Sequence, residues 1–279
     1  MELLREDLQI QNTTGFTMIS DRQNGLENAL AEVFPGAEFR FCVRHLHANF
    51  KKDHGGLLLK QMMWCCARAT TPAEFTKRMA ELKAEDEKAY QWLLNKDPKA
   101  WSKSHFRTHV KCDMLLNNLC ESFNSAIMPA RDKPIITLLE KLRFWLMCRF
   151  ASKRNEAEKW LHPVGKRVLA IIEKQKQVAR YCQSTLAGNA KFQVTFLGTE
   201  TFVVDLRARV CTCRSFELSG IPCPHALACI WSTGLDDMDY VDGWYKKPTY
   251  SAAYSAIIEP MTSPDKWPES GLHPIVPPP

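Results

Sequence analysis

The spacing of apolar residues near the start of the chain changes from the strand period to the helix period and back. Residues 16–20 form a strand-like run, and after Asp21 apolar residues recur on one face of a helix over 26–33, which a Pro-Gly pair stops. Apolar positions then alternate with polar ones over 39–43, which predicts a second strand. The pattern therefore predicts a strand, helix, strand unit with Asp21 at the carboxyl end of its first strand.

Nearly every segment from residue 57 to about residue 184 has helical spacing. Thr71-Pro-Ala-Glu74 is a capping box, in which the Thr hydroxyl and the Glu carboxylate can each accept from a free amide at the helix start. It predicts a long helix that runs to about Leu94. Further helices are expected from Pro134 toward Trp160, and from Pro163 to Gly188-Asn189.

Basic residues gather on the last two of these predicted helices, with glutamates among them. The mixed signs favour a solvated helix face, and a face that contacts phosphates is the alternative. The basic residues are Lys141, Arg143, Arg149, Lys153, Arg154, Lys166, Arg167, Lys174, Lys176 and Arg180.

After residue 190 the apolar residues recur at every second position, which is the spacing of a strand. Residues 192–196 and 202–206 alternate around a turn that contains Gly198, which predicts a hairpin. The segment that starts at Pro224 is expected to be a helix closed by Gly234. From about Ser263 the Pro-rich composition predicts a poorly ordered tail.

Four metal-ligating side chains follow the predicted hairpin. Cys211 and Cys213 are separated by one residue, nine residues follow, and Cys223 and His225 form a second close pair. Three thiolates and one imidazole make a closed tetrahedral set that suits structural Zn²⁺ and leaves no open position for catalysis. A unit this small gains little from apolar burial, whereas structural zinc supplies on the order of 10 kcal/mol. The alternative is a set of reduced core thiols beside a histidine, and Cys229 is either a spare ligand or a packing residue.

Composition narrows the possible classes of protein. The chain has 279 residues, of which 45% are apolar and 24% charged, and its net charge is +6. Neither a secretory signal pattern nor a membrane-length apolar run is evident, so we expect a soluble globular chain. The eleven cysteines are an odd number, and many lie singly in apolar helical stretches, which favours a reducing compartment, cytosol or nucleus, over a disulfide framework. The mild positive charge permits a polyanionic partner without requiring one.

The cysteine pattern resembles the SWIM zinc finger, whose signature is CxCxnCxH and whose expected fold is two strands and a helix. That resemblance implies a zinc-dependent binding module for DNA or for protein in which no residue is catalytic. A second resemblance covers about residues 3–160. The passages TMISDRQNGLENALAEVFP, FRFCVRHLHANF, NNLCESFNS and ARDKPIITLLEKLR look like the transposase domain of plant Mutator-like elements, which a SWIM finger commonly follows.

The transposase resemblance implies a ribonuclease-H-like fold in which two Asp and one Glu hold two divalent metals. Asp21 matches the second aspartate, Glu121 is the best match to the glutamate, and Cys42 and His45 match a CxxH signature whose role stays open. No match to the first aspartate is found ahead of Asp21, because the twenty preceding residues are too few for the expected antiparallel strands. Mg²⁺ would bind only if that site were completed. Without the expected preceding strands, the strand at 16–20 would have an unpaired edge, which favours aggregation or a partner there.

Each of these residues also has a simpler interpretation. Asp21 is a good N-cap for the helix that follows it, and Glu121 could be an ordinary helix charge. Cys42 and His45 could be a partly buried thiol and a surface imidazole. We therefore regard Asp21 and Glu121 as remnants of a catalytic site.

The combined expectation is a transposase-derived zinc-binding protein in the nucleus, with DNA or a nuclear protein as its partner and without strand transfer. One alternative is an active transposase whose first catalytic Asp lies in a missing upstream segment, and another is a zinc-dependent protein-interaction adaptor. The expected fold is α+β, with a partial ribonuclease-H-like α/β domain, a large helical portion and a small ββα finger. The expected domains are 1–160 (truncated transposase domain), 161–190 (helical linker), 191–235 (SWIM-type finger) and 236–279 (acidic, then Pro-rich tail).

Overall fold

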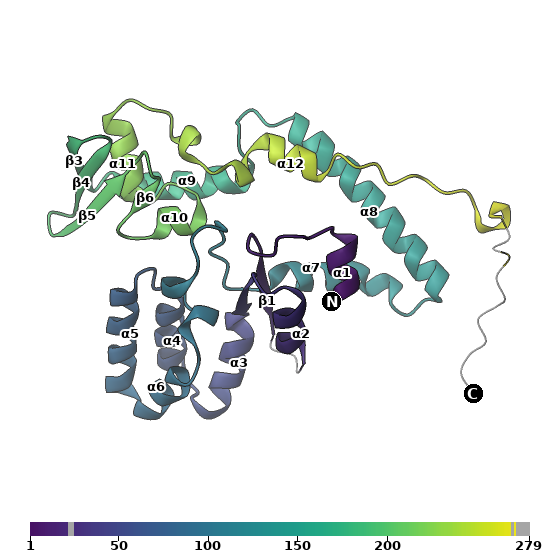
Figure 1. The fold of residues 1–279 in the computed structure, drawn as a ribbon, viewed down its shortest axis with the longest axis horizontal. Coiled ribbons are helices and arrows are strands. Elements are labelled where there is room, and N and C mark those ends of the chain that lie inside the picture. The colour runs from purple at the N-terminus through teal and green to yellow at the C-terminus, as the bar shows by residue number, and fades with distance from the viewer. Residues whose placement is uncertain (22–24, 269–270, 272–279) are drawn as a thin grey trace.

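The computed structural model describes residues 1–21, 25–268 and 271, and Figure 1 shows how their helices and strands are arranged. The described residues contain a two-stranded sheet near the N-terminus and a four-stranded sheet near the C-terminus. Buried apolar side chains form three separate clusters, one around the first sheet, one in a helical unit and one under the second sheet. The fold is therefore mixed helix and sheet, with a small C-terminal sheet.

The N-terminal part confirms the predicted strand, helix, strand order. Strands β1 and β2 are parallel, with Thr17 opposite Glu38, and Phe34 is fully buried beside them. The second strand is shorter than predicted, because it ends at Phe41 and a helix begins at Val43. The elements are α1 (Glu2–Asp7), β1 (Thr17–Ser20), α2 (Leu26–Val33), β2 (Glu38–Phe41) and α3 (Val43–Asp53).

The helical unit, residues 57–105, contains the predicted capping box. Thr71 Oγ1 accepts from the Glu74 amide at 3.2 Å, and Glu74 Oε2 accepts from the Thr70 amide at 3.1 Å. The prediction of a single helix that reaches Leu94 is wrong, because the helix ends at Glu85. The carboxylate of Asp86 then accepts from the Ala89 amide and caps the start of a new helix. The elements are α4 (Leu57–Arg68), α5 (Pro72–Glu85), α6 (Glu87–Leu94), η1 (Pro98–Ala100) and η2 (Lys103–His105).

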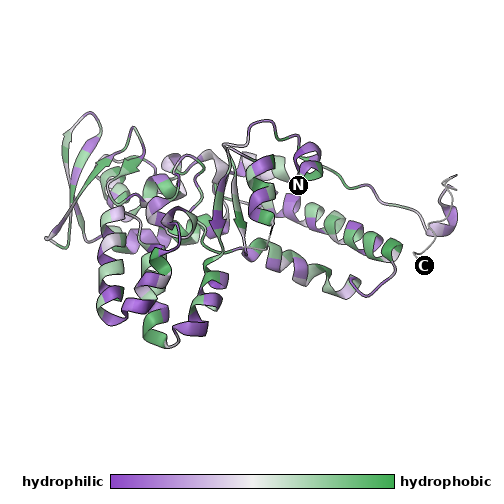
Figure 2. Cartoon of the chain, turned by 60° about the horizontal axis from the view of Figure 1, so that its bottom comes forward, coloured by the Kyte–Doolittle hydropathy of each residue, from purple (hydrophilic) through white to green (hydrophobic). Residues whose placement is uncertain are grey.

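A pair of helices, α7 (Asn118–Ile127) and α8 (Ile135–Glu158), extends away from the rest of the chain and is called the α7–α8 arm here. The predicted helix after Pro134 is confirmed as α8, and of its 24 residues only Ala157 is buried. Figure 2 shows apolar residues along the arm, and several large ones are exposed. Arg143 bonds Glu140 and Lys153 bonds Glu156, so these charges form the solvated, mixed-sign face.

The C-terminal unit contains two strands that the sequence pattern did not predict, β3 and the two-residue β6. Helix α9 ends at Ala179, and residues 182–188 are not helix but strand β3, which pairs with β4 so that Ser184 lies opposite Val194. The predicted hairpin is confirmed as β4 and β5, within the sheet order β3-β4-β5-β6. The elements are α9 (Lys166–Ala179), β3 (Cys182–Gly188), β4 (Lys191–Phe196), β5 (Glu200–Asp205), β6 (Val210–Cys211), α10 (Ser215–Ser219) and α11 (Pro224–Ser232).

Short elements follow the sheet and lead the chain back over the α8–α9 junction (Figure 1). They are η4 (Asp237–Tyr240), η5 (Gly243–Tyr245), α12 (Lys247–Ala253) and η6 (Pro264–Lys266). The tail predicted from Ser263 falls largely outside the described residues, beyond η6. Among the helices that the structure describes, none combines the length and the apolar character that crossing a bilayer requires.

Candidate metal centre

The four predicted zinc ligands lie together in the C-terminal unit. Cys211 ends β6, Cys213 follows in a tight turn, Cys223 is the N-cap of α11, and His225 lies in that helix's first turn after a proline at position N1. One ligand atom from each residue lies within 4.8 Å of the others. The sheet and the helix thus bring two close pairs together, as their separation in the sequence predicts.

The imidazole of His225 presents its Nδ1 to the thiols. This nitrogen lies 3.5 Å from Cys211 Sγ and 3.9 Å from Cys223 Sγ. Phe202 from β5 stacks on the imidazole ring at 3.7 Å with an interplanar angle of 18°, and Phe196 from β4 meets it edge-on. The hairpin therefore fixes the ring orientation, and Nδ1 is the nitrogen placed for coordination.

The backbone around the first thiol pair supports the cluster. Arg214 adopts a left-handed conformation (φ 59°), which turns the chain directly after Cys213, and its amide donates to the Cys211 carbonyl at 2.7 Å. Glu217 Oε2 accepts from the Cys211 amide at 3.0 Å. A non-glycine residue in this region is strained by roughly 1 kcal/mol or more, so the surrounding contacts must hold it there.

The three thiols affect one another's ionisation because their sulfur atoms are within hydrogen-bond reach. Hydrogen bonds from Cys211 and Cys223 lower the pKa of Cys213. The hydrogen bond to Cys213 raises the pKa of Cys211, and hydrogen bonds to Cys211 first and to Cys213 second raise the pKa of Cys223. Three thiolates at this separation repel one another unless a cation lies among them. A zinc ion supplies that charge, so the Cys₃His set fits structural Zn²⁺ and leaves no open position for a reacting group.

The comparisons with known proteins agree with this geometry. A family model described as SWIM zinc finger matches residues 192–233, which include all four ligands. This segment is a SWIM zinc finger domain. The chain matches no curated protein and no solved structure. The similarity to plant transposases therefore rests on sequence passages alone, and no comparison supports it.

The SWIM finger sits on the helical unit through the segment between its two ligand pairs. The guanidinium of Arg214 donates to the Thr70 and Ser104 carbonyls of this unit and to the Phe106 carbonyl directly after it. Leu218 of α10 is almost fully buried, in the apolar cluster of the helical unit. The sequence pattern does not predict this contact, because a lone arginine between two cysteines carries no signal of a partner more than a hundred residues away.

Two further contacts fix the same segment. Lys111 Nζ donates to the Glu217 carbonyl at 3.1 Å, and the Tyr245 hydroxyl donates to the Lys111 carbonyl at 3.1 Å. Gly220 (φ 73°) ends α10 so close to Asp242 that a Cβ at this glycine would lie 2.7 Å from the aspartate Cβ. The ligand-bearing loop is thus tied both to the helical unit and to the chain that follows the finger.

Cys229 is a packing residue rather than a spare ligand. It is fully buried in the apolar cluster under the sheet and is not part of the four-residue ligand group. Burial raises the pKa of its thiol to about 12. Its place one turn after His225 therefore reflects the apolar face of α11.

The two carboxylates carried over from the transposase resemblance lie in different elements. Asp21 is exposed directly after β1. The N-cap of α2 is Gly25, so the alternative in which Asp21 caps this helix is wrong. Glu121 lies in the first turn of α7, where Arg44 Nη1 is 2.5 Å from its Oε2. Within residues 1–21, 25–268 and 271, the zinc ligands are the only group of three or more metal-ligating side chains, and neither carboxylate belongs to it.

The CxxH pair has no metal partners in the part of the chain that the structure describes. Cys42 is buried, and its sulfur accepts from the Asn117 amide at 3.4 Å. His45 Nδ1 is buried, and none of the described residues provides a hydrogen-bond partner for it. The thiol therefore helps to position the start of α7, while the role of His45 stays open.

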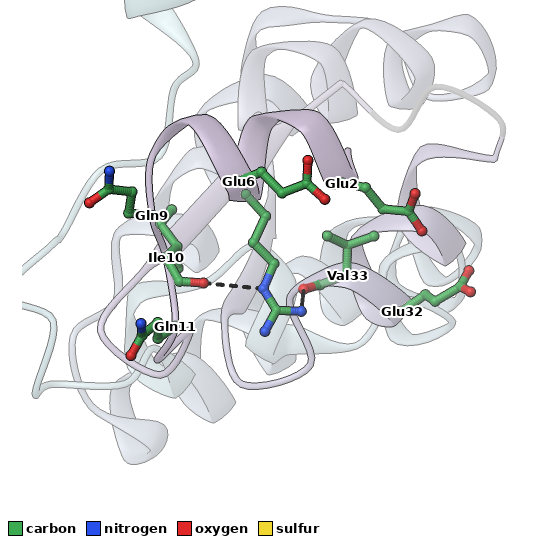
Figure 3. A pocket seen from close by; sticks show the side chains of 8 residues that line it. Glu2, Glu6, Gln9, Ile10, Gln11, Glu32 and Val33 are labelled. Carbon is green, nitrogen blue, oxygen red and sulfur yellow. Dashed lines mark hydrogen bonds between the residues drawn. The ribbon is translucent and has the colours of Figure 1, made fainter.

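A cavity of about 550 Å³ lies near the N-terminus between α1 and the end of α2. Arg5 donates from Nε to the Ile10 carbonyl and from Nη1 to the Val33 carbonyl, and Figure 3 draws both bonds. Glu2, Glu6 and Glu32 also line it. Because the arginine is engaged in joining the two helices, we assign this cavity no chemical role.

Proposed function

We propose that this protein is a binding protein whose SWIM finger, held together by zinc, contacts DNA or a protein partner and catalyses no reaction. The observation that carries the proposal is the closed Cys₃His group inside a matched SWIM finger. All four donor positions of a tetrahedral zinc are filled by side chains, so the metal's contribution is to the fold. The surface that zinc holds in shape is then what a partner recognises.

The test compares metal content with binding. Elemental analysis of purified protein should give one zinc per chain, and Cys223→Ser should lose it. Cys229→Ser is the matched control, because this cysteine is also buried but lies outside the ligand group. Loss of duplex DNA binding in the first variant but not in the second, with affinity that falls as salt rises, would support a DNA partner. Absence of bound zinc would overturn the proposal.

A protein-interaction adaptor is the other form of the same proposal, and salt separates the two. Binding to duplex DNA releases counterions, so its affinity falls steeply between two salt concentrations. If zinc-loaded protein shows no salt-sensitive affinity for duplex DNA, a DNA partner of the finger is rejected and the adaptor form of the proposal is retained.

The basic residues of α8 offer less to a phosphate backbone than their number indicates. Arg143 pairs with Glu140, and Arg154 donates to the Tyr254 and Ala256 carbonyls, so both are already engaged within the chain.

We further propose that the N-terminal part derives from a Mutator-like transposase and that the protein acts in the nucleus. We also propose that its domains follow the boundaries expected from the sequence, except that residues 182–188 of the expected helical linker belong to the finger's sheet as β3. Supporting the descent, Asp21 follows β1 directly in a parallel strand, helix, strand unit. We propose that strand transfer is absent, because Arg44 holds the carboxylate of Glu121. Nicking of labelled DNA in the presence of Mg²⁺, abolished by Asp21→Asn, would overturn this and favour the active transposase.

A further inference from the structure

A cavity at the junction of α8 and α9 is not used by the SWIM finger. Its volume is about 390 Å³, and its walls come from four segments: the end of α8 with the residues after it, the start of α9, η5 and α12. Figure 1 shows α12 passing beside this junction. The walls carry four aromatic rings and two cationic side chains, those of Trp160, Trp244, Tyr245, Tyr250, Lys166 and Arg167.

The cavity is held by contacts between segments that are far apart in the sequence. The Lys247 amide donates to the Pro163 carbonyl at 2.7 Å, which joins α12 to the loop before α9. The rings of Trp160 and Tyr250 pack with centroids 4.6 Å apart. Gly165 is required at this point, because a Cβ there would lie 2.9 Å from the Trp160 ring. The walls are therefore formed before any ligand arrives.

Trp244 projects from this framework with most of its ring free. Its side chain is 67% exposed, although it lies between residues that are fixed on both sides. Tyr245 beside it is tied by its hydroxyl to the Lys111 carbonyl. A large exposed ring on an anchored backbone is suited to stacking against a flat partner, because little conformational freedom is lost on binding.

The charge of the cavity is positive. Lys166 and Arg167 are exposed, and no carboxylate of the described residues lies within ion-pair distance of either. Glu156 also lines the cavity; Lys153 Nζ lies 2.6 Å from its Oε2, and the charge of Lys166 also acts on this carboxylate. With two cations and one already paired carboxylate in the lining, the net charge is positive, which favours an anionic ligand and opposes the cationic ligands that aromatic cages otherwise accept.

We propose that this cavity binds an unpaired base of single-stranded nucleic acid, with the base stacked on Trp244 and the adjoining phosphates beside Lys166 and Arg167. Aromatic rings beside cations are the combination that single-strand binding uses, because every base has a flat face and every nucleotide a charge. Bases in a duplex are already stacked on each other, so a duplex does not offer the face that Trp244 needs. The site is separate from the SWIM finger and does not depend on what the finger binds.

The experiment titrates the full zinc-loaded protein into a fluorescein-labelled oligothymidylate of about 12 nucleotides and follows anisotropy. Trp244→Ala should weaken binding about tenfold, and Trp244→Phe, which keeps a ring, should stay within about threefold of the parent. Tyr181→Ala is the control, because this exposed ring lies outside the cavity. Circular dichroism of each variant checks that the fold is retained.

A second pair of variants tests the phosphate contacts. Replacing Lys166 and Arg167 by Ala together should lower the slope of log affinity against log salt by about 1.4, since each single-strand phosphate contact contributes about 0.7. Lys174→Ala, on the same helix but outside the cavity, should leave the slope within about 0.3 of the parent value.

Three outcomes would overturn the proposal: no binding of the oligothymidylate, parental affinity in Trp244→Ala, or Trp244-dependent binding of a trimethyl-lysine peptide in place of the oligonucleotide. Competition by duplex DNA at equal concentration would also count against it. The proposed function of the finger is tested by a separate measurement, that of zinc-dependent binding to duplex DNA or protein. Failure of zinc-dependent duplex or protein binding, with Trp244-dependent oligothymidylate binding intact, would reject the finger's proposed function and retain the cavity's.

Discussion

The SWIM finger and the α7–α8 arm differ in how their residues are held. In the finger, α11 spans nine residues, and six of them are buried, while the metal ligands converge within 4.8 Å. In the arm, α8 spans 24 residues and buries one. The finger's structure therefore depends on a packed core and on a metal. The arm depends more on local propensity and on side-chain pairs along one face, and its tertiary contacts include those of Arg143 and Arg154 with carbonyls of residues 254–259. Secondary structure alone does not reveal which parts of a chain are packed.

Loss of zinc should produce the largest difference in stability between the finger and the arm. Cys223→Ser removes one of four donors, and structural zinc contributes on the order of 10 kcal/mol, so the finger should lose its folded core. The arm holds no metal-ligating group and should keep its helix. Amide hydrogen exchange, resolved by segment, measures both: fast exchange in β4, β5 and α11 with unchanged exchange in α8 is expected. Parental protection of α11 in this variant would contradict the role given to zinc.

A matched pair of leucines gives the next largest effect. Leu227 is fully buried in the finger, so Leu227→Ala should lower the free energy of unfolding by roughly 2–5 kcal/mol, through the lost transfer energy and the cavity left behind. Leu139 in the arm is 53% exposed, so Leu139→Ala should change it by less than about 0.5 kcal/mol. Urea denaturation of both variants is the measurement. Equal losses would mean that the arm is packed against a partner in solution.

The contact between the finger and the helical unit should respond to a change at Arg214. Arg214→Ala leaves the Thr70, Ser104 and Phe106 carbonyls without their donor, at a cost of roughly 2–3 kcal/mol. Zinc content should stay at one per chain, because the side chain lies outside the ligand group.

Thermal unfolding of Arg214→Ala, combined with metal analysis, separates docking from metal binding. Arg214→Lys is the conservative control, and it should recover only part of the loss because an ammonium group lacks the planar fork of donors. Full stability in Arg214→Ala would show that the three carbonyls are satisfied in another way.

The smallest effect is expected from acid titration of the arm. The hydrogen bond from Lys153 lowers the pKa of Glu156 below its ordinary value of 4.5. A depressed folded pKa means that the pair's contribution is present above pH 4.5 and is lost as the pH falls through the lowered value. Because the pair is solvent-exposed, the change is slight. Glu156→Gln should remove this part of the pH dependence of amide exchange at the end of α8, and an unchanged profile would show that the pair contributes nothing.

Local signals in the sequence identified much of the fold. The Thr71–Glu74 box, the helix after Pro134 and the β4–β5 hairpin were predicted because capping and periodicity act over a few residues. The breaks were less predictable. Asp86 ends one helix and caps the next inside an unbroken helical pattern. Residues 182–188 become a strand because β4 offers an edge to pair with, which no local pattern records.

Local patterns identified the metal ligands, because cysteine and histidine at close spacing leave few other uses for a thiolate set. They also identified the starts of α5, α8 and α11, where a capping box or a proline marks the first turn. Only the tertiary structure decided that Arg214 joins the finger to the helical unit, that Arg44 holds Glu121, and that aromatic residues more than eighty positions apart line one cavity. The physical reason is that ligand spacing and helix capping are local in the chain, whereas docking, ion pairing and cavity formation depend on residues that meet only once the chain has folded.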